Sequence, residues 1–153
     1  MKYDMTKLRG HSDTVHDYVS APSKAKDAFD KRRAEYKLDA SVVKELKKAK
    51  NYSIYAFSAE WCPDCWRNIP VLDLLAEATG MEARVFGHIM RDAKSNIRKW
   101  AIPPSPPEVD EFNVVKIPLF VVLKKGGEKV GEIVENPPPG KTLEQSILDI
   151  VKA

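Results

Sequence analysis

Two cysteines, Cys62 and Cys65, are the residues of this sequence best suited to chemistry, and the sequence contains no others. They lie three positions apart in the segment Trp61-Cys62-Pro63-Asp64-Cys65. Small chains that depend on disulfides for stability usually spread several cysteines over distant segments, and this chain does not. A pair at this spacing is typical of a dithiol that is oxidised to a disulfide and reduced again. The pair is therefore a candidate redox centre.

The position of the pair predicts which cysteine attacks a substrate. Residues 52–58 (YSIYAFS) are mostly β-branched and aromatic, which predicts a buried strand, and residues 65–80 keep helical spacing up to a terminating glycine. Cys62 then lies where a strand passes into a helix, and the helix N-terminus stabilises a thiolate there. We expect Cys62 to be the nucleophile and Cys65, one turn further in and more buried, to resolve the mixed disulfide.

The two residues between the cysteines also have predictable effects. Pro63 suits the first turn of a helix, because its missing N–H would have no partner within the helix. Asp64 brings a carboxylate close to the thiolate of Cys62 and opposes its formation. We therefore expect Asp64 to raise the pKa of Cys62 and to make the couple more reducing than a neutral residue would.

Helices and strands alternate along the rest of the sequence, punctuated by proline and glycine. The patterns predict helices over 12–20, 23–38, 41–50, 93–101 and 142–151, and strands over 83–90, 118–124 and 128–134. The alternation near the cysteines implies parallel strands joined by a helix, and the turn at Gly126-Gly127 implies an antiparallel hairpin. We expect an α/β three-layer sandwich, with a central mixed sheet of about four strands and helices on both faces.

The cysteine pair also admits three interpretations other than redox chemistry. One Cys-x-x-Cys pair is half of a zinc site, but His11, His16 and His88 do not have ligand spacing with a second cysteine. A cluster bridging two chains is a further alternative without positive support in the sequence. An inert pair is the simplest alternative, and the strand-to-helix position argues against it. We expect no metal and no bound cofactor.

Composition limits the classes of function. With 153 residues of which 43% are hydrophobic, the chain is long enough for one domain with a core and too short for two. Residues 1–13 lack the apolar core of a signal peptide, and no apolar run approaches the roughly 20 residues that span a bilayer. We expect a cytoplasmic monomer that binds neither membranes nor nucleic acid, since the basic residues of 24–50 are interleaved with acidic ones.

Taken together, these residues resemble the thioredoxin family. The segment AEWCPDC (59–65) resembles the family's A-E-W-C-x-x-C segment, and Pro70 falls where the family keeps a proline that kinks the active-site helix. Ile117-Pro118 resembles the family's Ile-Pro-Thr strand entry, whose proline is cis and faces the disulfide. The resemblance implies a thioredoxin-like domain over 39–153, and residues 1–38 form an N-terminal helical extension that a minimal thioredoxin lacks.

The sequence also departs from the family pattern. Where typical thioredoxins bury an aspartate six residues before the first cysteine, this chain has Ala56, so the usual proton acceptor for the second cysteine is absent. His88 lies roughly where the family often has a lysine beside that aspartate, and it is a candidate substitute; the alternative is a partly buried strand histidine with no catalytic task. The pair between the cysteines is Pro-Asp rather than Gly-Pro, which bears on the substrate range.

The resemblance implies a thiol-disulfide oxidoreductase that reduces protein or small-molecule disulfides and takes electrons from a separate reductase or a low-molecular-weight thiol. Its catalytic residues would be Cys62 and Cys65. Substrate would contact Trp61, Pro63, Asp64, Ile117 and Pro118, with the main chain of Ile117 pairing with an extended segment. The Pro-rich loop 103–109 is a candidate wall of the substrate groove. Two alternatives are a redox-responsive binding module with a dedicated partner and a reductase specialised for a small disulfide or an oxidised peroxidase.

Overall fold

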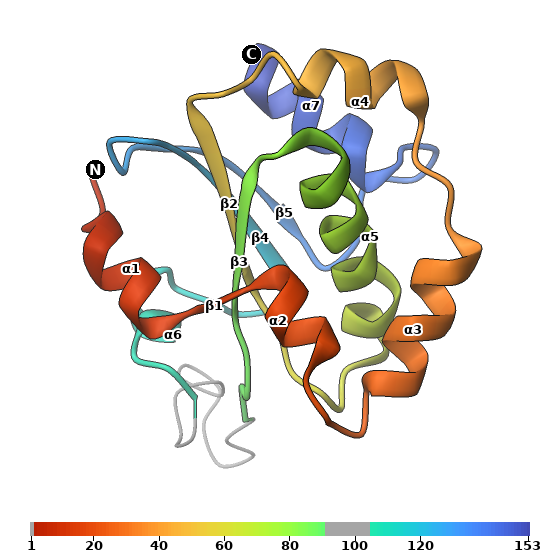
Figure 1. The fold of residues 1–153 in the computed structure, drawn as a ribbon. Coiled ribbons are helices and arrows are strands. Elements are labelled where there is room, and N and C mark those ends of the chain that lie inside the picture. Colours follow the sequence, from red (N-terminus) through yellow and green to blue (C-terminus); the bar gives the residue numbers. More distant parts are fainter. Residues whose placement is uncertain (1, 91–104) are drawn as a thin grey trace.

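The computed structural model describes residues 2–90 and 105–153, and Figure 1 shows a central sheet between two layers of helices. The strands are β1 (Asp13–Thr14), β2 (Tyr52–Phe57), β3 (Glu82–Phe86), β4 (Leu119–Lys124) and β5 (Lys129–Val134). The helices are α1 (Met5–His11), α2 (Val15–Ser20), α3 (Lys26–Glu35), α4 (Ala40–Leu46), α5 (Pro63–Thr79), α6 (Glu108–Glu111) and α7 (Leu143–Lys152). The expected α/β three-layer architecture is confirmed.

The sheet is mixed, as expected, and its strand order is β1-β3-β2-β4-β5. β2 pairs in parallel with β3, to which α5 connects it, and the other neighbouring pairs are antiparallel. The four strands expected from the sequence are all present. The fifth, β1, is a two-residue strand that pairs with the outer edge of β3 through Asp13 and Thr14.

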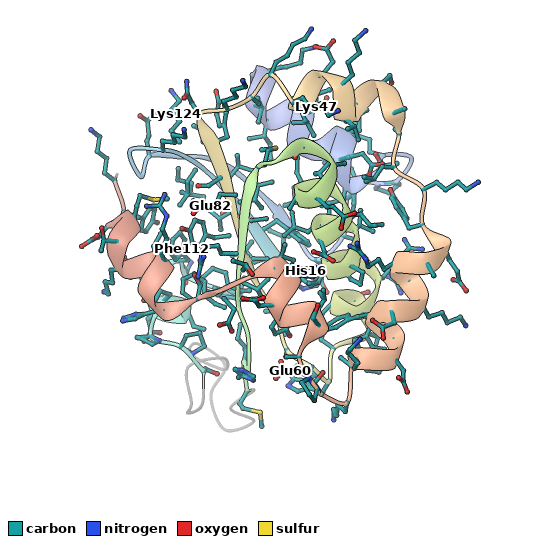
Figure 2. All side chains as sticks on the ribbon, viewed as in Figure 1. His16, Lys47, Glu60, Glu82, Phe112 and Lys124 are labelled. Atoms are coloured by element: carbon teal, nitrogen blue, oxygen red, sulfur yellow. The ribbon has the colours of Figure 1, made fainter. Side chains whose placement is uncertain are left out.

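The two faces of the sheet are covered by different parts of the chain (Figures 1 and 2). α1 and α6 lie on one face, where Tyr3 stacks on Phe112 with ring centroids 4.1 Å apart. α2, α5 and α7 lie on the other face, and α3 packs on the outside of α5. Because side chains alternate along a strand, Tyr55 and Phe57 of β2 lie on the face that α1 and α6 cover, while Ala56 and the following Ser58 face α5.

The ends of the elements follow local chemistry. α5 ends at Gly80, which takes a left-handed φ of 78° that glycine adopts at little cost. α7 begins after Thr142, whose hydroxyl accepts a hydrogen bond from the N–H of Gln145 and so caps the helix. None of the helices in the described part of the chain is long and apolar enough to cross a membrane.

Several boundaries differ from the sequence predictions. The strand expected over 83–90 ends at Phe86, because Gly87 and the positive φ of His88 carry the chain away from the ladder. The helix expected over 12–20 begins only at Val15, and the short helices α1 and α6 were not predicted. The helix expected over 93–101 lies outside the described residues.

Candidate active site

The two cysteines lie at the junction of β2 and α5, at the carboxyl end of the parallel strands. Cys62 is the N-cap of α5, and its Sγ accepts a hydrogen bond from the N–H of Cys65 at 3.3 Å. Both are free cysteines, and both are buried; Cys62 retains 5% of its exposure and Cys65 none. Only the first cysteine is therefore within reach of a second molecule.

The surroundings of the two thiols shift their pKa values in opposite directions. The pKa of Cys62 is lowered, first by a hydrogen bond with the thiol of Cys65 and then by the N–H of Cys65, against the opposing effect of burial. The negative charge of Asp64 raises the pKa of Cys62, which is the direction that the sequence predicts. Burial raises the pKa of Cys65 well above its ordinary value. The thiolate therefore forms first on Cys62.

The segment before β4 lies against the sulfur of Cys62. The Ile117–Pro118 peptide bond is cis, and the thiol of Cys62 donates to the carbonyl oxygen of Ile117 across 3.8 Å. Ile117 is buried, and β4 begins at Leu119, directly after the proline. Residues more than fifty positions apart in sequence thus meet at the dithiol.

The other residues that the sequence singled out surround Cys62. Trp61 is half-buried, and its indole N–H donates to the carbonyl oxygen of Ile89 at 2.9 Å. Pro63 is exposed at the first position of α5. Asp64 forms an ion pair at 2.8 Å with Arg67, one turn further along the same helix, so its charge is partly balanced. These residues form the rim of the dithiol.

A buried chain of hydroxyl groups next to Cys65 was not foreseen from the sequence. The hydroxyl of Ser58 lies beside Cys65 and lowers the pKa of that thiol, and it is 3.0 Å from the hydroxyl of Tyr18, which donates to Glu60 at 2.9 Å. His88 contacts Glu60 at 2.5 Å through Nδ1, and its side chain is 65% exposed. His88 is thus exposed and lies outside β3, so the prediction of a partly buried strand histidine is wrong. Figure 2 shows Glu60 at the same end of the sheet as this site and Lys124 at the other end.

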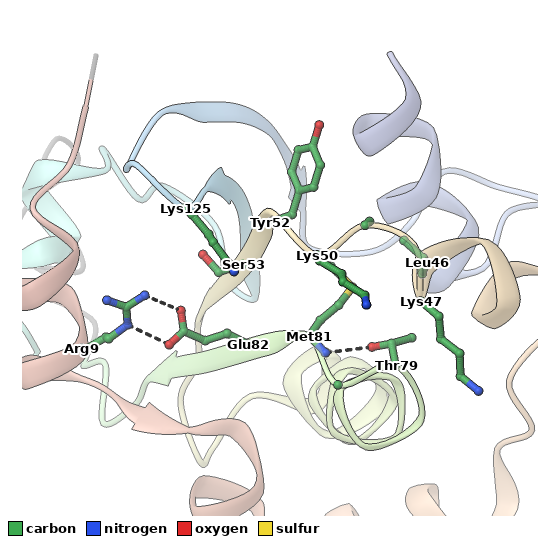
Figure 3. Close-up of a pocket in the computed structure, with 12 residues that line it drawn as sticks. Arg9, Leu46, Lys47, Lys50, Tyr52, Ser53, Thr79, Met81, Glu82 and Lys125 are labelled. Carbon is green, nitrogen blue, oxygen red and sulfur yellow. Dashed lines mark hydrogen bonds and ion pairs between the residues drawn. The ribbon is translucent and has the colours of Figure 1, made fainter.

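Two cavities of about 420 Å³ lie away from the cysteines. Figure 3 shows one of about 420 Å³ at the amino ends of β2 and β3, where Arg9 binds Glu82 through two hydrogen bonds of 2.8 and 3.1 Å beside Lys50 and Lys125. It lies at the opposite end of β2 from the cysteines. Within residues 2–90 and 105–153, no group of three or more His, Cys, Asp or Glu side chains is placed to hold a metal ion.

Comparison with solved structures finds the same fold. A protein of unknown function from Pseudomonas aeruginosa, PA1234, matches with a TM-score of 0.70 and 18% identity over 98% of this chain and 96% of its own. An HIV epitope scaffold matches with the same values. Thioredoxin from Fasciola hepatica is 18% identical and covers 74% of this chain and 90% of its own, with a TM-score of 0.44.

Comparison by sequence gives the assignment. No curated protein matches the chain. A family model described as Thioredoxin matches residues 12–147, which is most of the sequence and includes the cysteine pair and the proline before β4. The match begins ahead of β1. The chain therefore belongs to the thioredoxin family.

Proposed function

We propose that this protein is a thiol-disulfide oxidoreductase that reduces protein or small-molecule disulfides at Cys62 and Cys65. The observation that carries the proposal is the contrast between the two thiols. Cys62 caps α5 with a lowered pKa, while Cys65 is buried beneath it with a raised pKa. An attacking thiol and a resolving thiol need this division of properties.

In the first step, the thiolate of Cys62 attacks one sulfur of the substrate disulfide. A mixed disulfide forms between Cys62 and that sulfur, and the other substrate sulfur leaves as a thiolate that takes up a proton. The N–H of Cys65, which donates to the sulfur of Cys62 at 3.3 Å, stabilises the attacking thiolate.

In the second step, Cys65 loses its proton and attacks the sulfur of Cys62. The bond between the two cysteines forms, the mixed disulfide breaks, and the second substrate sulfur leaves reduced. Two electrons have then passed from the protein to the substrate. An external dithiol, a reductase or a low-molecular-weight thiol must restore the dithiol for the next cycle.

Substrate contact is proposed for the rim around Cys62. The carbonyl oxygen of Ile117, the residue before Pro118, lies 3.8 Å from the sulfur of Cys62. It is placed to accept a hydrogen bond from the main chain of an extended substrate segment. Trp61 offers a flat apolar surface, and Pro63 and Asp64 are accessible beside it. A preference for the reducing direction accords with a cytoplasmic location, which we also propose.

Reduction of insulin disulfides with dithiothreitol as electron source tests the proposed function. We expect the wild-type protein to accelerate insulin precipitation above dithiothreitol alone, and both Cys62→Ser and Cys65→Ser to lose this acceleration. Urea unfolding of each variant, followed by circular dichroism, ensures that lost turnover is not lost folding.

Absence of turnover in the folded wild-type protein would contradict general reductase activity. If the dithiol were then still oxidised stoichiometrically by a disulfide, a redox-responsive binding module or a reductase with a narrow substrate would be favoured. A panel of small disulfides and oxidised peroxidases would separate these two.

A further inference from the structure

We propose that Ser58 and Tyr18 relay the proton of Cys65 to Glu60 during the second step of the proposed reaction. The inference rests on the proposed function, since it concerns how the resolving thiol becomes a nucleophile. It assigns a role to a tyrosine of the N-terminal segment, 40 residues away in sequence from the serine that it contacts.

The resolving thiol needs such a route because it is cut off from water. Cys65 has no exposed surface, and burial raises its pKa, so the thiolate does not form spontaneously in appreciable amounts at neutral pH. Ala56, which faces α5 from β2, offers no carboxylate that could take the proton. Ser58 follows the end of β2 and faces the same side as Ala56, and its hydroxyl lies beside Cys65, where it lowers the pKa of the thiol.

The direction of the hydrogen bonds follows from counting donors. A carboxylate only accepts, so the single proton of the Tyr18 hydroxyl is donated to Glu60 across 2.9 Å. The bond of 3.0 Å between the two hydroxyls must then use the proton of Ser58. In the reduced protein the thiol of Cys65 donates to Cys62. Once Cys62 is held in the mixed disulfide, its thiolate is gone, and the proton of Cys65 can turn to the hydroxyl of Ser58. In the mixed disulfide each donor of the chain then points away from Cys65 and toward Glu60.

The relay moves one proton at each link and leaves no charge on a hydroxyl. As the sulfur of Cys65 attacks that of Cys62, its proton passes to Ser58, the proton of Ser58 to Tyr18, and that of Tyr18 to Glu60. Burial raises the pKa of Tyr18, so the tyrosine releases its own proton only as it receives another. Before the bond to Cys62 forms, Ser58 can donate to the developing thiolate of Cys65, an arrangement that lowers the pKa of Cys65.

The outer end of the chain reaches solvent. Glu60 is 18% exposed and contacts His88, whose side chain is 65% exposed, so the proton can leave by this route. A cavity of about 230 Å³ is lined by Tyr18, Glu60 and His88, and its lining also includes the carboxylates of Asp13 and Asp17. Among the described residues, Asp64 also acts on Cys62 from α5.

The fold makes room for the tyrosine at this position. Tyr18 is 6% exposed, and its ring contacts Phe29 with centroids 5.7 Å apart. A Cβ atom at Gly87 would overlap the Cε1 atom of Tyr18. Gly87→Ala is therefore expected to displace the ring and its hydroxyl, whereas Tyr18→Phe removes only the hydroxyl.

Stopped-flow reaction of the reduced protein with one equivalent of 5,5′-dithiobis(2-nitrobenzoate) separates the two steps. Attack by Cys62 releases the first thionitrobenzoate in a bimolecular phase, and attack by Cys65 releases the second in a unimolecular phase. We expect Ser58→Ala and Tyr18→Phe to slow the unimolecular phase about tenfold or more, and to shift its pH profile to higher pH. The rate of the bimolecular phase is expected to stay unchanged.

Tyr55→Phe is the matched control. Tyr55 is also fully buried on the sheet, and its hydroxyl has no hydrogen-bond partner among the described residues. We expect this variant to keep both the rate and the pH profile of the wild-type protein. Gly87→Ala should behave like Tyr18→Phe if it folds, which urea unfolding of all variants establishes.

The outcomes distinguish the relay from the function on which it rests. If the folded wild-type protein releases no second thionitrobenzoate, Cys65 does not resolve the mixed disulfide, and the proposed function fails. If the wild-type protein releases it and Tyr18→Phe does so at the same rate with the same pH profile, the relay is refuted and the proposed function stands. A rate loss without a shifted pH profile would assign Tyr18 a purely structural role and would also refute the relay.

Discussion

Replacing Arg33 with methionine tests how firmly the N-terminal segment is joined to the helix that begins at the cysteines. Asp73 of α5 is 2% exposed, and its carboxylate binds the Nη1 atom of Arg33 at 2.5 Å and the Nδ1 atom of His16 at 3.3 Å. The other terminal nitrogen of Arg33 binds Glu77, one turn further along α5. Methionine preserves most of the apolar stem of Arg33 and removes its charge.

The expected loss of stability follows from the burial of the carboxylate. Removing one partner of a buried ion pair costs about 3–5 kcal/mol, because the other charge is left without compensation. Arg33 is 28% exposed and His16 remains as a partner of Asp73, so the expected loss falls somewhat below this range. We expect the free energy of unfolding to fall by about 2–3 kcal/mol, which at a typical urea m-value lowers the midpoint by about 1–2 M.

Urea unfolding followed by circular dichroism measures this loss, with Lys26→Met as the control. Lys26 forms an ion pair with Asp30 on the surface of α3, and an exposed pair at this spacing contributes about 0.5 kcal/mol or less. In the Arg33→Met background, Asp73→Asn should restore part of the stability, since it removes the unpaired charge. Equal midpoints for Arg33→Met and Lys26→Met would refute the anchoring role of the buried carboxylate.

Three further predictions concern the thiols and the packing of α7. Iodoacetamide should modify Cys62 at a rate that levels off at a lower pH than for an ordinary cysteine, because a lowered pKa lets the thiolate form at lower pH. It should spare Cys65 in the folded protein, where the pKa of that thiol is raised. Mass spectrometry over a pH series measures both. Asp64→Asn should lower the pKa of Cys62 further by removing a negative charge, and an unchanged pH profile of alkylation would exclude Asp64 from the account. Tyr36→Phe should lower the free energy of unfolding by about 1–2 kcal/mol, measured in urea, because the hydroxyl donates at 2.7 Å to the fully buried carboxylate of Glu144; a loss within experimental error would refute this.

The parts of the fold that sequence reasoning predicted are those fixed by neighbouring residues. The start and end of α5 depend on Pro63 at its first position and Gly80 after its last, and both are visible as residue types. The central strands appear as apolar runs because both faces of the sheet are covered. The mixed arrangement followed from the helix that joins β2 to β3 and from the turn that joins β4 to β5.

The parts that sequence reasoning missed depend on contacts between distant segments. Asp13 and Thr14 are polar and exposed, so no pattern marks them as a strand, and they form one only because the edge of β3 is available. Ser58 could have been singled out, since it shares a strand face with Ala56 and precedes Cys62 by four residues. Nothing local in the sequence indicates that Tyr18 lies beside it.

Trapping of the mixed disulfide tests most directly whether Cys62 attacks and Cys65 resolves. Each single-serine variant is reduced, mixed with an excess of a disulfide substrate such as oxidised glutathione or insulin, quenched in acid and mapped by peptide mass spectrometry. We predict that Cys65→Ser accumulates the adduct on Cys62, and that Cys62→Ser forms little adduct while folded, since Cys65 is fully buried with a raised pKa. Rapid adduct formation on Cys65 in folded Cys62→Ser, with none on Cys62 in Cys65→Ser, would contradict the assigned roles.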